Sequence, residues 1–163
     1  MIRIGLLSDT HNYLHPRVIE FFNSTDEIWH AGDMGSVSIA NKLSEIKPFK
    51  GVYGNIDGQD VRTVYPKELR FTCENVDTWI THIGGYPGRY NPDVKERISL
   101  NPPKLFICGH SHILKVIYDK KLKLLHINPG AAGKYGLHQV ITAIRFVIDG
   151  SDIKGLEILE LKR

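Results

Sequence analysis

The chain has 163 residues, 42% of them hydrophobic and 24% charged, with a formal net charge of +3, which is typical of a single globular domain over residues 1–163. Its apolar runs are too short for a membrane helix, its basic residues are spread along the chain, and its first residues lead directly into a strand-like run. We therefore expect no membrane segment, no signal peptide and no dedicated nucleic-acid surface. The two cysteines are too few for a disulfide framework, and this favours a cytoplasmic location.

The first part of the chain alternates between strand and helix patterns. Pro16 suits the first turn of a helix, and Ser36 is a suitable N-cap before apolar residues at helical spacing. We predict strands over Ile2–Leu7, Glu27–His30 and Phe49–Tyr53, and helices over Pro16–Phe22 and Ser36–Ile46.

Strand patterns dominate the rest of the chain. Glu74-Asn75 lies between two of them as the turn of a hairpin, and Pro102-Pro103 ends a helix predicted over Asn91–Leu100. The predicted strands are Glu68–Cys73, Val76–Thr81, Leu105–Cys108, Leu114–Tyr118, Leu122–Ile127, Val140–Ile148 and Ile153–Leu161. An alternating part followed by a mostly antiparallel part predicts two sheets packed face to face with helices outside.

Potential metal ligands follow five of the predicted strands, each at the carboxyl end where αβ sheets gather their functional residues. They are Asp9, His11, Asp33, Asn55, His82, His110 and His112. Each has an ordinary explanation by itself, because Gly-Asp and Gly-Asn are common turn dipeptides and a lone histidine is usually structural. Together they form a set of nitrogen and oxygen ligands without a thiolate, which suits a catalytic transition metal rather than a structural zinc. Seven side chains exceed the needs of one ion, so the set predicts two.

Asp9 and His11 are two residues apart after a strand. Because side chains alternate along a strand, positions i and i+2 point the same way, and we expect both to face one ion. His110 and His112 repeat this spacing, and Gly109 before them lets the backbone bend closely around a ligand.

In chain order, the stretches Asp-x-His, Gly-Asp, Gly-Asn, a lone His and Gly-His-x-His resemble the calcineurin-like metallophosphoesterase superfamily along the whole chain. The short length, Gly54-Asn55-Ile56-Asp57 and Asn128-Pro129-Gly130 resemble its small YfcE-type phosphodiesterase branch. The resemblance implies a four-layer α-β-β-α sandwich of the α/β (α+β) class, with two mixed sheets face to face and helices outside.

The resemblance also implies two divalent transition-metal ions, with manganese favoured over iron, cobalt, nickel or zinc. The implied ligands are Asp9, His11 and His112 for one ion and Asn55, His82 and His110 for the other, with Asp33 bridging both. A hydroxide between the ions would attack phosphorus in line, and Asn55 would also contact a phosphoryl oxygen. Asp57 and Asn128 are candidates to orient the ligand histidines.

Three features depart from the family pattern. Many relatives carry a histidine after the asparagine, as an acid for the leaving group, and a carboxylate that orients it. Here these positions hold Ile56 and Ser36, which puts leaving-group protonation in doubt and favours aryl over alkyl esters. Relatives also carry a second histidine close after the lone one, where this chain has Gly84 and Gly85, so His82 is the least secure of the implied ligands.

These observations predict a dinuclear-metal-dependent phosphoesterase that acts on a small phosphate ester, with diesters favoured. The alternative is a non-catalytic, retromer-subunit-like scaffold on the same fold that binds proteins; retention of all seven ligands favours the enzyme. A metal-dependent nuclease is the weakest interpretation, because the chain has neither an added DNA-binding domain nor a basic stripe. The sequence leaves open whether the chain forms a homo-oligomer.

Overall fold

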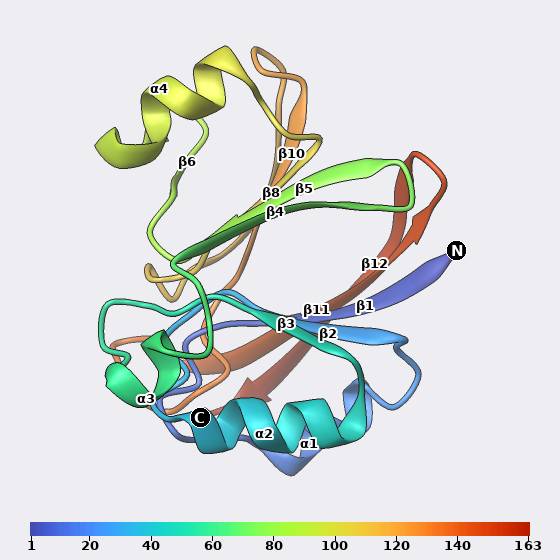
Figure 1. Ribbon diagram of the computed structural model, residues 1–163. Helices are drawn as coiled ribbons and strands as arrows, with labels where there is room; N and C mark the ends of the chain where they lie inside the picture. The colour runs from blue at the N-terminus through green and yellow to red at the C-terminus, as the bar shows by residue number, and fades with distance from the viewer.

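The computed structural model describes residues 1–163 and contains two five-stranded β-sheets that face each other (Figure 1). Three helices pack against the outer face of the first sheet, and a fourth packs against the outer face of the second. Helices, sheet, sheet and helix form four layers, which confirms the predicted sandwich with two mixed sheets. No helix has the length and apolar character needed to span a membrane.

The first sheet combines segments from both ends of the chain. Its elements and neighbouring helices are β1 (Ile2–Leu7), α1 (Pro16–Phe21), β2 (Glu27–His30), α2 (Val37–Ile46), β3 (Phe49–Gly51), α3 (Gln59–Arg62), β11 (Val140–Asp149) and β12 (Asp152–Lys162). The strand order is β12-β11-β1-β2-β3. β1, β2 and β3 run parallel, so their carboxyl ends meet at one edge, whereas β11 is antiparallel to both β1 and β12.

The second sheet is less antiparallel than predicted. Its elements and helix are β4 (Glu68–Cys73), β5 (Val76–Thr81), α4 (Pro92–Leu100), β8 (Leu105–Ile107), β9 (Leu114–Asp119) and β10 (Leu124–Pro129), in the order β4-β5-β8-β10-β9. β5, β8 and β10 run parallel, because α4 carries the chain back between β5 and β8 and β9 carries it back between β8 and β10. Only the edge strands β4 and β9 are antiparallel to their neighbours.

The remaining differences from prediction are local. Helix α3 and a small hairpin of β6 (Gly85–Tyr86) and β7 (Arg89–Tyr90) were not predicted, because each is too short to show a periodic pattern. Ser36 does occupy the N-cap position of α2, but its hydroxyl contacts Ser38 Oγ at 2.8 Å instead of capping the helix.

Three apolar cores separate the four layers. The core between the sheets includes Leu6, Ile80 and Ile107. A second core lies under α1, α2 and α3, and a third lies under α4. Gly5 serves the second core, because a Cβ there would come within 2.7 Å of the Phe22 ring that packs onto β1. Burial on both sheet faces fixes the strands, and therefore the positions of the loops that leave them.

Candidate metal centre

The structure brings all seven predicted residues together at the carboxyl ends of β1, β2, β3, β5 and β8. Six of them form two groups with ligand atoms within 4.8 Å of one another. The groups are Asp9, His11 and His112, and Asp33, His82 and His110. Asn55 joins the second group, because its Oδ1 lies 3.0 Å from His110 Nδ1. The two groups are adjacent, since His11 Nε2 lies 3.8 Å from Asp33 Oδ2.

Asp9 is completely buried, and its two carboxylate oxygens have different surroundings. Oδ2 accepts hydrogen bonds from Ser8 Oγ at 2.6 Å and from the His110 backbone N–H at 3.0 Å. Oδ1 has no hydrogen-bond donor and lies 3.2 Å from His112 Nε2. Burial alone would raise the pKa of this carboxyl, but contacts with His11 and His112 outweigh it and hold the pKa far below its usual range.

Asp33 lies between the two groups. Its Oδ1 accepts a hydrogen bond from the Ile56 backbone N–H at 3.0 Å, and its Oδ2 lies 3.1 Å from His82 Nε2 and 3.8 Å from His11 Nε2. Burial alone would raise the pKa of Asp33. The contact with His82 and the hydrogen bond from Ile56 outweigh burial, so the pKa lies below its usual value. A single oxygen of Asp33 therefore faces both groups.

His82 is fixed in one ring orientation. Its Nδ1 lies 2.7 Å from the Ala31 carbonyl oxygen and donates to it, which leaves the Nε2 lone pair directed at Asp33 and Asp9. Burial disfavours the imidazolium, but the two carboxylates outweigh burial and raise the pKa of His82. A buried imidazole with one nitrogen tied to a backbone carbonyl and the other facing carboxylates has the form of a metal ligand.

His112 is oriented by His138, a residue outside the set predicted from the sequence. His138 Nε2 donates to the Gly133 carbonyl at 2.8 Å, so its Nδ1 is an acceptor. That Nδ1 lies 3.3 Å from His112 Nδ1, which donates to it and leaves His112 Nε2 free to face Asp9. No signal in the sequence joins these histidines, because the contact spans 26 residues and depends on a loop.

The backbone around the site is unusual. Five of the seven residues have a left-handed φ between +45° and +69°, which few non-glycine residues adopt; they are Asp9, His11, Asp33, His110 and His112. The alternation argument is therefore wrong, because β1 and β8 end before these residues and the loops that follow are not extended. Asp9 and His11 still converge, whereas His110 and His112 fall in different groups. Strained backbone of this kind is concentrated at functional sites.

Two glycines allow the loops to approach each other. A Cβ on Gly54 would overlap the Asp33 carboxylate, and a Cβ on Gly109 would overlap Ser8 Oγ. The predicted role of Gly109, close approach of the backbone, agrees with this geometry.

Asp57 and Asn128 support the loops rather than the histidine rings. Asp57 accepts backbone hydrogen bonds from Met34, Gly35 and Gly54 at 2.8 to 3.2 Å, which joins the loop after β2 to the loop after β3. Asn128 Nδ2 donates to the Gly109 carbonyl at 2.9 Å. Both residues therefore act on the backbone that carries the ligands.

The polar atoms at the centre of the site fit a metal centre. Asp9 Oδ1, His11 Nε2 and His82 Nε2 are buried and have no hydrogen-bond partner. Buried polar atoms without partners are rare and costly, on the order of 1–3 kcal/mol each. Three such atoms that converge on one another could share one ligand, and their donor chemistry fits a divalent transition metal.

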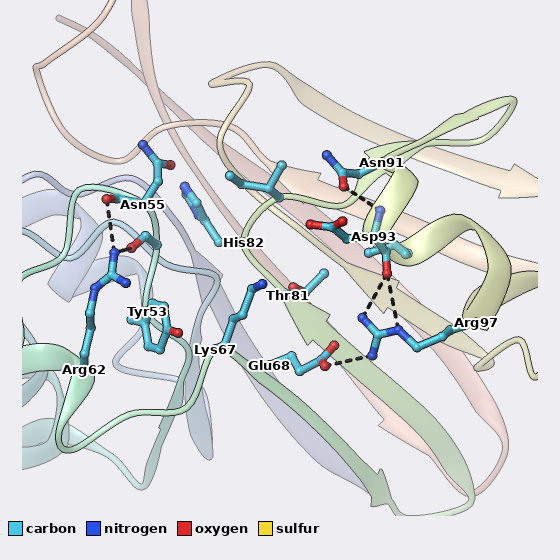
Figure 2. A pocket seen from close by; sticks show the side chains of 13 residues that line it. Tyr53, Asn55, Arg62, Lys67, Glu68, Thr81, His82, Asn91, Asp93 and Arg97 are labelled. Carbon is cyan, nitrogen blue, oxygen red and sulfur yellow. Dashed lines mark hydrogen bonds and ion pairs between the residues drawn. The ribbon is translucent and has the colours of Figure 1, made fainter.

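A pocket of about 300 Å³ adjoins the second group, with Asn55 and His82 in its lining (Figure 2). Thr81, the last residue of β5, and Ile83, just after it, line the pocket together with residues of α4. The side chain of Ile56, where relatives carry a histidine, is 46% exposed and has no proton to transfer.

Comparison with known proteins agrees with this geometry. A family model for the calcineurin-like phosphoesterase superfamily domain matches residues 2–151. The chain belongs to this superfamily. The match confirms the family resemblance read from the order of the five stretches, and it covers every residue of the two groups.

Two curated relatives are named for related activities. A probable metallophosphoesterase of Methanothermobacter thermautotrophicus is 27% identical over 136 residues, which cover 78% of this chain and 76% of the relative. A phosphodiesterase of Methanocaldococcus jannaschii is 23% identical over 150 residues, which cover 82% of this chain and 86% of the relative. Among solved structures, wild-type Vps29 of Entamoeba histolytica in complex with Zn²⁺ has a TM-score of 0.73 and 14% identity, covers 99% of each chain and shares the fold.

Proposed function

We propose that this member of the superfamily is a phosphoesterase that uses two divalent transition-metal ions and favours phosphodiesters. The convergence of the unpartnered buried atoms of Asp9, His11 and His82 carries the proposal. These atoms belong to two adjacent groups, which supports two ions rather than one. The names of the two archaeal relatives support a phosphoesterase, and one of them supports the diester preference.

The proposal assigns the three residues of the first group to one ion. The second ion takes His82, His110 and Asn55. Asp33 would serve both ions, because its Oδ2 faces both groups while its Oδ1 accepts the Ile56 N–H. Manganese is the proposed metal because the family resemblance implies it; the carboxylate, amide and imidazole ligands without a thiolate are compatible with manganese and with other divalent transition metals.

Bound divalent ions supply a water of lowered pKa as the nucleophile and neutralise charge on the phosphoryl oxygens. The protein positions the ligands: Ala31 fixes the ring of His82, and His138 fixes the ring of His112. Asn55 contacts a phosphoryl oxygen through its amide. Ile56 cannot supply the proton that the family histidine would supply, so ester groups that leave without a proton are the preferred substrates.

The alternative function is a scaffold that binds other proteins, as proposed from the resemblance to a retromer subunit. The Vps29 structure shares the fold and is described as a Zn²⁺ complex, so metal binding alone does not separate the two functions. Catalysis does.

The test is hydrolysis of bis-p-nitrophenyl phosphate by purified protein. We expect turnover with added Mn²⁺, loss of turnover with EDTA, and slower hydrolysis of alkyl diesters by about 100-fold or more, because general acid catalysis is typically worth about 10²–10⁴-fold. A folded, Mn²⁺-loaded protein that hydrolyses neither aryl diesters nor aryl monoesters would refute the enzyme and leave the scaffold.

A further inference from the structure

The pocket beside the second group contains cations that the metal centre does not use. Arg62 and Lys67 line it on the side of Asn55, and Asp93 and Arg97 of α4 line it on the opposite side (Figure 2). The pocket therefore begins at the place where a phosphoryl group would be held and continues between two charged walls.

Arg62 is held in place without a carboxylate partner. Its Nε donates to the Asp57 carbonyl at 2.6 Å, and its Nη2 donates to the Asn55 carbonyl at 3.2 Å. Its guanidinium also lies 4.5 Å from the centre of the Tyr53 ring. Backbone carbonyls and an aromatic ring hold the guanidinium but leave its positive charge uncompensated beside the loop that carries Asn55.

Lys67 makes no hydrogen bond and no ion pair within 4.0 Å, and Figure 2 shows its side chain extending into the middle of the pocket. The other ionic groups differ. Arg97 is paired with Glu68 at 2.8 Å, so these two charges offset each other. Asp93 is the remaining carboxylate, and it lies on the α4 side, away from Arg62.

We propose that Arg62 and Lys67 bind a second anionic group of the substrate, a phosphate or a carboxylate, while the scissile phosphoryl group lies at the metal centre. This inference rests on the proposed phosphoesterase function and specifies its substrate class: phosphodiesters with a further negative charge on the retained arm. Two uncompensated cations on one wall attract such a charge, and Asp93 repels it from the other wall. Lys67 is the specificity-determining residue, because no other interaction occupies it.

The test compares two aryl diesters that differ by one phosphate. Thymidine 5′-(p-nitrophenyl phosphate) carries one negative group, and the same compound with an added 3′-phosphate carries a second. Hydrolysis of either adds water at phosphorus, breaks the bond to the aryl oxygen and releases p-nitrophenolate. We expect the wild type to prefer the 3′-phosphate substrate by about tenfold in kcat/KM, because a favourable charge contact near the surface has roughly that effect.

Lys67→Met is expected to reduce this preference to about twofold or less. Lys42→Met is the matched control, because Lys42 is an exposed lysine on α2, outside the pocket, and it should keep the full preference. A wild type without the preference, or a Lys67→Met variant that keeps it, overturns the inference.

Binding separates this inference from the proposed function. Calorimetric titration of Mn²⁺-loaded protein should show thymidine 3′,5′-bisphosphate binding about tenfold more tightly than thymidine 5′-monophosphate, with the difference lost in Lys67→Met. If neither diester is hydrolysed but this difference is present, the catalytic proposal fails and the anion site stands. Equal affinities in the wild type overturn the anion site whether or not hydrolysis occurs.

Discussion

His82 and His126 are both buried histidines, and the structure surrounds them in opposite ways. The Nδ1–H of His82 donates a hydrogen bond to a backbone carbonyl, and its Nε2 faces Asp33. His126 lies on β10 beside Phe106, with a ring-centroid distance of 5.8 Å, and neither of its nitrogens has a hydrogen-bond partner. Burial lowers the pKa of His126 to about 4, and nearby Lys115 lowers it in the same direction. At His82, the carboxylates overcome the same effect of burial and raise the pKa.

The comparison shows that burial alone does not identify a metal ligand. His30 makes the same point, since it is fully buried and both of its nitrogens are satisfied, by Thr10 Oγ1 at 3.0 Å and the Gly32 N–H at 3.1 Å. What distinguishes His82 is an unpartnered nitrogen that faces carboxylates.

The largest effect is expected at Asp33. Asp33→Asn keeps the size of the side chain but removes the charge that faces both groups, so we expect hydrolysis of bis-p-nitrophenyl phosphate to fall by at least about 100-fold. Asp152→Asn, at the exposed first residue of β12, is the matched control and should retain full activity. Activity of Asp33→Asn within twofold of the wild type would contradict the assignment.

A smaller effect is expected at His138, which contacts no carboxylate but orients His112. His138→Phe should weaken Mn²⁺ binding by about 10–100-fold, the usual effect of removing a residue that orients a ligand. His138→Gln should restore part of the affinity, because its amide oxygen accepts from His112 Nδ1. His126→Phe makes the same substitution away from the site and should leave the affinity unchanged. Unchanged affinity in His138→Phe would remove His138 from the site.

The smallest expected effect is on the pH dependence of stability, through His126. The pKa of His126 is about 4 in the folded protein and about 6.5 when unfolded, so the unfolded state binds more protons between these values. The free energy of unfolding therefore decreases as the pH falls from about 6.5 to about 4, and His126 accounts for up to about 3 kcal/mol of this decrease. His126→Phe should lose less stability than the wild type over this range, as measured by urea unfolding at each pH. Parallel losses in the two proteins would show that His126 is not the cause.

The sequence predicted the strands well, because burial on both sheet faces leaves continuous apolar runs such as Leu105–Ile107. It did not predict that β5, β8 and β10 are parallel, because strand pairing depends on where the crossover through α4 returns the chain. Short elements such as α3 give no periodic signal.

The seven residues proposed for the site could be selected from the sequence because each follows a strand whose end is fixed by the core. The reason offered for their convergence was wrong, since left-handed turns rather than strand alternation direct Asp9 and His11. His138 and Lys67 could not be found from the sequence, because their surroundings arise from loops that only the folded chain brings together.

The most direct test of the central claim is calorimetric titration of metal-free, folded protein with Mn²⁺. The two adjacent groups predict that about two ions bind per chain. Binding of a single ion, or of none, would contradict the account of a dinuclear centre.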